Sequence, residues 1–174
     1  TALVDRVRAV IEIARPAGIP VVVNDRADVA VAAAADGVHL GQDDLPVEAA
    51  RRVVGGLALI GGSAHDLDEA RRNHEAGCDY CGMGRFAAST TKPDVVAGGP
   101  ALVRAMSATF PEWPQLAIGG IGPDNIDQVV AAGGVAIAVC EAACDADDPA
   151  AVVADLRNRL QQASESTADA EVSP

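Results

Sequence analysis

Short apolar runs alternate with longer helical segments along most of the chain, and this alternation limits the fold more than any other feature. The apolar runs predict six strands, at residues 19–23, 37–40, 57–62, 79–84, 115–120 and 135–140. Helices are predicted near residues 2–15, 27–35, 46–53, 66–76, 98–108, 124–132 and 148–162. This order indicates right-handed βαβ units and a parallel sheet in an α/β fold. Six strands suit an open doubly wound sheet, or a (βα)₈ barrel without its first two strands.

Composition and charge indicate a single folded domain and argue against a nucleic-acid-binding or membrane protein. The 174 residues are 49% hydrophobic but only 2% aromatic, which predicts one domain, residues 1–162, with a core of Ala, Val, Leu and Ile. The formal net charge of -12 argues against a nucleic-acid or anionic-membrane surface. With no apolar segment near the ~20 residues of a membrane span and no basic leader, we expect a soluble cytoplasmic protein. Residues 163–174 lack apolar periodicity and predict a disordered acidic tail.

The four cysteines form two close pairs, which raises the question of zinc. Cys78 and Cys81 are three residues apart in a strand-like run, so their side chains do not converge on one metal ion. We interpret all four as buried or incidental thiols in a reducing compartment.

Polar groups follow the first two predicted strands at their carboxyl ends, where parallel α/β folds bind ligands. Asn24, Asp25 and Arg26 end the first strand, and Asp44 follows the second. Two carboxylates at neighbouring strand ends are what a Mg²⁺ ion serving a diphosphate uses. The alternative for each aspartate is an ordinary cap on the helix that follows.

The third and fourth strand ends carry hydroxyls, a histidine and an ammonium group. Ser63 and His65 follow the third strand and suit hydrogen bonding or proton transfer. Lys92, the one lysine of the chain, closes "STTK" and suits a diphosphate; the alternative is a solvated loop cation. His39 lies within a strand and is interpreted as a packed core histidine rather than a catalyst.

The fifth strand ends in two adjacent glycines. Gly119 and Gly120 precede a helix, where backbone N–H groups at a positive helix end can bind a phosphate. The alternative is a tight turn without a ligand.

The order of these motifs resembles the thiamine phosphate synthase family. The resemblance rests on the segments "NDR", "DGVHLGQDDLP", "GGSAH", "DYCGMG" followed by "STTK", "AIGGI" and "DADDPAA". It covers about residues 10 to 162. The resemblance implies a (βα)₈ TIM barrel, here about six βα units. Family members begin with two further strands, the second carrying a Gln-x-Arg-x-Lys motif that no residue from Thr1 onward supplies.

The resemblance also implies an activity. The family is a transferase of thiamine biosynthesis that couples 4-amino-2-methyl-5-hydroxymethylpyrimidine diphosphate to thiazole phosphate, by a dissociative, Mg²⁺-assisted loss of pyrophosphate. By position, Asp25 and Asp44 match the metal ligands, and Lys92 and Ser63 match catalytic residues. The substrate-binding residues implied are Asn24, Arg26, Ser63, His65, Ser89, Thr91, Lys92, Gly119, Gly120, Cys140 and Glu141. The partners implied are these small-molecule substrates and a second copy of the chain, since family members often form oligomers.

Two alternatives to the synthase stay open at this point. One is a thiazole tautomerase-like enzyme, which uses an acid/base histidine without the metal pair, and the other is a non-catalytic remnant that binds thiamine-related phosphates. "GQDDLP" and "STTK" favour the synthase. Two departures from the family pattern are Arg85, where Pro is usual, and Glu141, where a Ser usually lies near the thiazole phosphate.

Overall fold

The computed structural model describes residues 1–56, 58–87 and 98–171, with side chains described up to residue 163. The chain divides into two compact units. The first unit comprises Thr1–Ala64 and Asp68–Cys81, and the second comprises His65–Leu67 and Gly82–Pro174.

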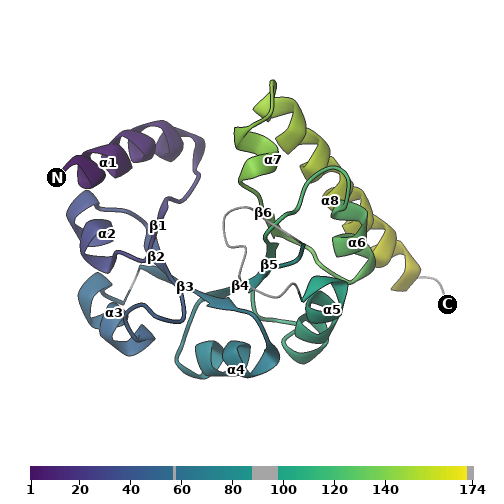
Figure 1. Ribbon diagram of the computed structural model, residues 1–174, viewed down its shortest axis with the longest axis horizontal. Helices are drawn as coiled ribbons and strands as arrows, with labels where there is room; N and C mark the ends of the chain where they lie inside the picture. Colours follow the sequence, from purple (N-terminus) through teal and green to yellow (C-terminus); the bar gives the residue numbers. More distant parts are fainter. Residues whose placement is uncertain (57, 88–97, 172–174) are drawn as a thin grey trace. The chain divides into compact units, whose positions relative to one another are not determined.

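In the first unit, helices alternate with parallel strands as the sequence predicts. The elements are α1 (Ala2–Ala14), the 3₁₀ turn η1 (Arg15–Ala17), β1 (Val22–Asn24), α2 (Ala27–Ala33), β2 (Gly37–Leu40), α3 (Val47–Val54), β3 (Leu59–Ala64), nearly all of α4 (Leu67–Glu75) and the start of β4 (Tyr80–Gly84). Asn24 pairs with His39, and His39 pairs with Gly61, so these three residues lie level across β1, β2 and β3. Figure 1 shows α1, α2 and α3 side by side along these strands.

The two faces of this parallel sheet differ in chemistry. Val38, Leu40 and Ile60 are fully or nearly fully buried on the face toward the helices. A Cβ at Gly62, on that same face, would meet the side chain of Asn73 in α4. The opposite face carries polar side chains, because alternate residues of a strand point to opposite sides. Asn24, His39, Ser63 and Tyr80 share this face, which we call the polar face of the first unit.

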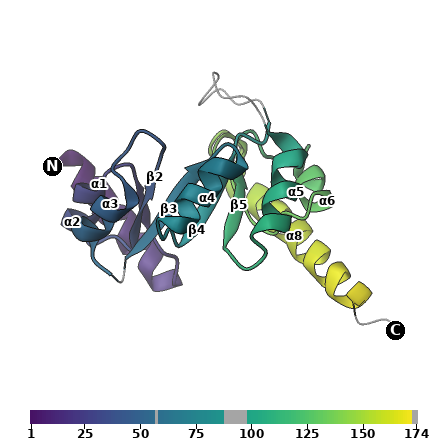
Figure 2. The same cartoon turned by 90° about the horizontal axis from the view of Figure 1, so that it is seen from below.

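The second unit repeats the strand–helix pattern. Its elements are the rest of β4, α5 (Gly99–Thr109), β5 (Gln115–Ile118), α6 (Ile126–Ala131), β6 (Ile137–Ala138), α7 (Glu141–Cys144) and α8 (Pro149–Glu171). β5 and β6 are parallel, with Ile118 level with Ala138. Figure 2 shows α5, α6 and α8 packed as neighbours. Val103, Met106 and Ile126 are almost completely buried between these elements. None of the helices in the described residues is long and apolar enough to cross a membrane.

Several boundaries differ from the predictions. β3 is Leu59–Ala64 rather than 57–62, so Ser63 lies within the strand and not after it, and β6 is only Ile137–Ala138 rather than 135–140. β1 begins at Val22 rather than at residue 19, because Gly18 adopts a left-handed conformation (φ 68°) after η1 and Pro20 has no N–H to donate. The short helix α7 follows β6 where no helix was predicted. Helix α8 continues to Glu171, into residues 163–174 that we expected to be a disordered tail. Ala and Glu are frequent there and favour helix without an apolar face.

The close pairing of β2 and β3 requires a residue without a side chain at position 37. A Cβ at this position would lie 2.3 Å from the Leu59 carbonyl oxygen, which belongs to the backbone and cannot move aside. We expect Gly37→Ala to lower the free energy of unfolding by about 2–3 kcal/mol in urea denaturation. The matched control is Gly56→Ala, where the added Cβ meets nothing within 4 Å, and we expect a change within about 0.5 kcal/mol. Equal effects of both substitutions would contradict the pairing.

Candidate active site

Asp25 follows β1 in an uncommon backbone conformation. Its φ is 65°, in the left-handed region that non-glycine residues rarely adopt and that recurs at functional sites. The Asp25 N–H donates to the His39 carbonyl oxygen at 2.8 Å, and the Asn24 side-chain amide donates to Asp25 Oδ1 at 2.7 Å. β2 and Asn24 therefore hold both the backbone and the carboxylate of Asp25.

Asp44 is held by the loop that follows β2. Its Oδ2 accepts the Gly41 N–H at 2.6 Å, and the side chain is half-buried. Helices α2 and α3 take Arg26 and Pro46 as their N-cap residues, so neither Asp25 nor Asp44 occupies an N-cap. The N-cap alternative for these two aspartates is wrong, because each carboxylate is oriented by groups at its own strand end.

The Arg26 side chain lies against α2. Its Nε and Nη2 donate to Asp28 at 2.8 and 2.6 Å, and both side chains are more than half exposed. This hydrogen bond from Arg26 lowers the pKa of Asp28 to about 2. Substrate binding by Arg26 stays a prediction, and would require exchange of this surface ion pair.

Ser63 is contacted by side chains from several elements of the first unit. Its Oγ lies 2.9 Å from His39 Nε2, and its carbonyl oxygen accepts from Gln42 Nε2 at 2.5 Å and Asn73 Nδ2 at 2.8 Å. His39 Nδ1 in turn lies 3.1 Å from the Tyr80 hydroxyl. No motif in the sequence predicted a site role for His39, Gln42 or Tyr80. The alternation of side chains along β2, which puts His39 on the polar face, was the one signal that could have indicated it.

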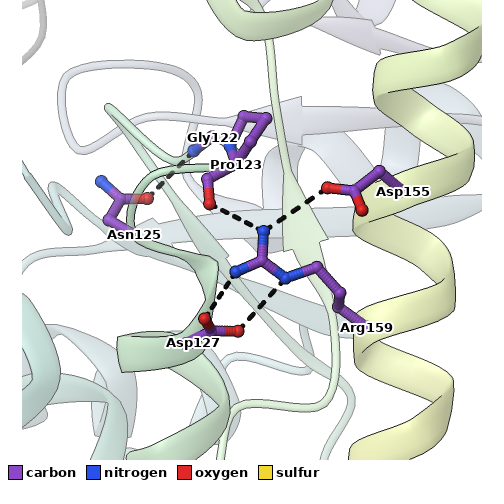
Figure 3. Close-up of polar contacts among 6 residues, drawn as sticks. All are labelled: Gly122, Pro123, Asn125, Asp127, Asp155 and Arg159. Atoms are coloured by element: carbon purple, nitrogen blue, oxygen red, sulfur yellow. Dashed lines mark hydrogen bonds and ion pairs between the residues drawn. The ribbon is translucent and has the colours of Figure 1, made fainter.

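In the second unit, the predicted glycine turn follows β5. Gly119 and Gly120 have φ values of 96° and 65°, which a side chain would strain. Asn125 closes the turn: its Oδ1 accepts the Gly122 N–H at 3.0 Å and its Nδ2 donates to the Gly120 carbonyl oxygen at 2.7 Å. Figure 3 shows the bond from Gly122 to Asn125 beside α6.

Arg159 of helix α8 forms hydrogen bonds to the residues that follow the same turn. Arg159 Nη1 donates to the Pro123 carbonyl oxygen at 2.7 Å, and its Nη2 and Nε contact the Asp127 carboxylate at 2.6 and 3.2 Å (Figure 3). A second carboxylate, from Asp155, lies 3.4 Å from Nη1. The bond to Asp127 is the main reason that the pKa of Arg159 is raised.

Arg85 and α7 adjoin the glycine turn. A Cβ at Gly119 would lie 2.7 Å from Arg85 Cγ, so the absence of a side chain admits the stem of the arginine. A Cβ at Gly122 would lie 3.2 Å from the Ala142 Cβ of α7. Cys140 and Glu141 leave β6 at the same end as Gly119 leaves β5, since the two strands are parallel neighbours. The structure thus brings Gly119, Cys140 and Glu141 to one end of the second unit.

The structure describes only some of the remaining predicted residues. His65 is half-buried just beyond β3 and belongs to the second unit. Ser89, Thr91 and Lys92 lie outside the described residues. Within the described ranges, no cluster of three or more His, Cys, Asp or Glu side chains forms a ready metal site. Burial raises the pKa of the Cys78 and Cys81 thiols to about 11 and about 12, so both stay protonated.

Comparison with known proteins identifies the family. Residues 1–143 match the family model described as thiamine monophosphate synthase. The chain belongs to this family. It is 49% identical over 145 residues to a thiamine-phosphate synthase of Saccharopolyspora erythraea, covering 82% of this chain and 65% of that protein. A bifunctional ThiM/ThiE protein of Symbiobacterium thermophilum is 44% identical over 155 residues, which are 87% of this chain and 32% of that protein. The chain thus spans less than two thirds of the length of these two relatives.

Solved structures agree with the family and the fold. Thiamine phosphate pyrophosphorylase from Pyrococcus furiosus superimposes with a TM-score of 0.85 at 31% identity, over 93% of this chain and 77% of that one. The N-(5'-phosphoribosyl)anthranilate isomerase of the same organism has a TM-score of 0.66 at 13% identity over 91% of this chain and 80% of that one, which is a likeness of fold alone. Like these proteins, the synthase-family chain has the α/β fold of the TIM-barrel class, with six parallel strands, as the sequence predicted.

The turn after β5 provides a prediction about Asn125. Replacing it with Ala removes the acceptor of the Gly122 N–H and the donor to Gly120, so we expect hydrogen exchange at the Gly122 amide to accelerate by about tenfold or more. The control is Asp124→Ala, an exposed neighbour, for which no acceleration is expected. Unchanged exchange in Asn125→Ala would show that the side chain does not hold the turn.

Proposed function

We propose that the chain carries the synthase chemistry of its family. The reaction couples 4-amino-2-methyl-5-hydroxymethylpyrimidine diphosphate to thiazole phosphate, giving thiamine phosphate and pyrophosphate. The observation that carries the proposal is the pair of strand-end aspartates. Asp25 is held in a strained backbone conformation and Asp44 is held by a loop amide, and neither is a helix N-cap.

The donor chemistry of these residues fits Mg²⁺. Mg²⁺ takes one or two protein carboxylates and completes its shell with water and substrate phosphates, so Asp25 and Asp44 would be enough to hold it. Each carboxylate has one oxygen fixed by an N–H donor, from Asn24 or Gly41, which orients the group before a metal arrives. When bound, Mg²⁺ supplies charge stabilisation to a departing diphosphate.

The protein's own residues have positioning roles in this reaction. The bond between the pyrimidine methylene carbon and the diphosphate oxygen breaks, with both electrons leaving on oxygen. The ring nitrogen of the thiazole then donates its lone pair to that carbon and forms the new C–N bond. Asn24 and Ser63 on the polar face would donate hydrogen bonds to the diphosphate, and Lys92 and Thr91 are assigned to the same leaving group. No protein nucleophile is needed.

The second unit would bind the other phosphate. Backbone N–H groups at Gly119 and Gly120 would donate to the phosphate oxygens, because these two glycines carry no side chains of their own in the turn. The Gly122 N–H is already bonded to Asn125 and holds the turn. Arg85 beside Gly119 adds a positive charge that no sequence motif predicted there. The nearby anion Glu141 works against a phosphate, so we expect Arg85 to offset it. Cytoplasmic location and self-association stay predictions.

The decisive assay measures thiamine phosphate by mass spectrometry after incubation with both phosphorylated substrates. We expect product only when Mg²⁺ is present, and a fall of about 100-fold or more in kcat/KM for Asp25→Asn and Asp44→Asn, because each substitution removes a charged metal ligand.

The control is Asp43→Asn, which removes an equal charge one residue from Asp44. This exposed side chain has no assigned role, so we expect kcat/KM within about threefold of the unmodified chain. Metal-independent product, or an equal fall in all three variants, would overturn the assignment of Asp25 and Asp44.

A further inference from the structure

His39 joins two hydroxyl groups across the polar face of the first unit. Its Nε2 lies 2.9 Å from Ser63 Oγ in β3, and its Nδ1 lies 3.1 Å from the Tyr80 hydroxyl in β4. The His39 and Tyr80 rings are tilted by 31° with centroids 5.5 Å apart. All three side chains are half-buried, so the hydrogen bonds are partly shielded from water.

Gly61 makes this arrangement sterically feasible. It lies level with His39 on the same face, and a Cβ there would lie 2.1 Å from the Tyr80 ring and 2.4 Å from His39 Nδ1. The two side chains therefore meet above the bare backbone of Gly61.

The direction of the two hydrogen bonds depends on the tautomer of His39, and we take Tyr80 as the donor to Nδ1. Burial raises the pKa of Tyr80 above its ordinary value, so the phenol remains protonated and can donate to His39 Nδ1. A neutral imidazole that accepts at Nδ1 carries its proton on Nε2. That N–H then donates to Ser63 Oγ, and the Ser63 hydroxyl proton is left to point away from His39.

Ser63 is also fixed at its backbone. Gln42 and Asn73 both donate to its carbonyl oxygen, from the loop after β2 and from α4. Oγ and the carbonyl of one residue are thus held by three side chains from three different elements. A serine required only for packing needs none of these contacts.

We propose that His39 and Tyr80 are positioning residues, which orient the Ser63 hydroxyl so that it donates its proton to an anionic oxygen of the diphosphate substrate. This inference rests on the proposed synthase function. It assigns His39 a role in the site, beyond its predicted role as a packed core residue.

The test is a double-mutant cycle between His39 and Ser63. Asn at position 39 can replace Nδ1 but does not reach Ser63, whereas Gln reaches the position of Nε2. We expect His39→Asn and Ser63→Ala each to lower kcat/KM by about tenfold or more, and the double variant to lie within about threefold of Ser63→Ala alone. His39→Gln should recover most of the activity. His74→Asn, on the exposed surface of α4, is the control.

A second readout does not depend on turnover. The chain has three histidines, so ¹⁵N NMR of the imidazole rings resolves each of them. We expect His39 Nδ1 to be unprotonated and Nε2 protonated, and Tyr80→Phe to shift His39 toward the other tautomer. Binding of magnesium pyrophosphate, measured by calorimetry, should weaken in the same non-additive way in the His39 and Ser63 variants, with the folded fraction checked by urea denaturation.

These outcomes separate the inference from the proposed function. Absence of turnover by the unmodified chain would refute the synthase assignment for this chain. The tautomer of His39, and the binding of magnesium pyrophosphate by the His39 and Ser63 variants, would still decide the role of His39. Losses that multiply in the double variant, or a proton on His39 Nδ1, would overturn the positioning role even in an active enzyme.

Discussion

The parallel register of β1, β2 and β3 is the constraint on which the first unit depends. With Asn24, His39 and Gly61 level, side chains on the even-numbered positions of β2 and β3 pack under the helices, and the odd-numbered positions form the polar face. A shift of one residue in β2 would bury His39 beneath the helices and expose Val38 and Leu40. The apolar core and the polar face are therefore specified by the same pairing.

Glycines allow the elements of each unit to approach closely. Gly37 admits the Leu59 backbone, Gly62 admits Asn73, and Gly61 leaves space for two rings. In the second unit, Gly119 has a similar relation to Arg85. With so few aromatic residues in the chain, close backbone contact and many small apolar side chains fill the space that large rings fill elsewhere.

In the proposed function, local groups rather than the overall charge bind the phosphorylated ligands. A formal net charge of -12 repels anions at long range. At the strand ends, however, carboxylates suited to a cation are held by N–H donors, and the turn after β5 presents backbone N–H groups with Arg85 beside it. Asn125 closes that turn, and Arg159 of α8 holds it from outside.

Much of this protein follows from its sequence alone. The strand–helix alternation determined the parallel α/β fold, and the position of Asp25, Asp44 and Gly119 after apolar runs placed them beyond strand ends, because both properties depend on local pattern. Ser63 was expected after the third strand but lies within β3. Only the tertiary structure decided that the aspartates are not N-caps, that Arg85 lies on Gly119, and that His39 joins Ser63 to Tyr80. These contacts link residues up to 41 positions apart, and they depend on strand register and on space beside particular glycines, which no local pattern in the sequence specifies.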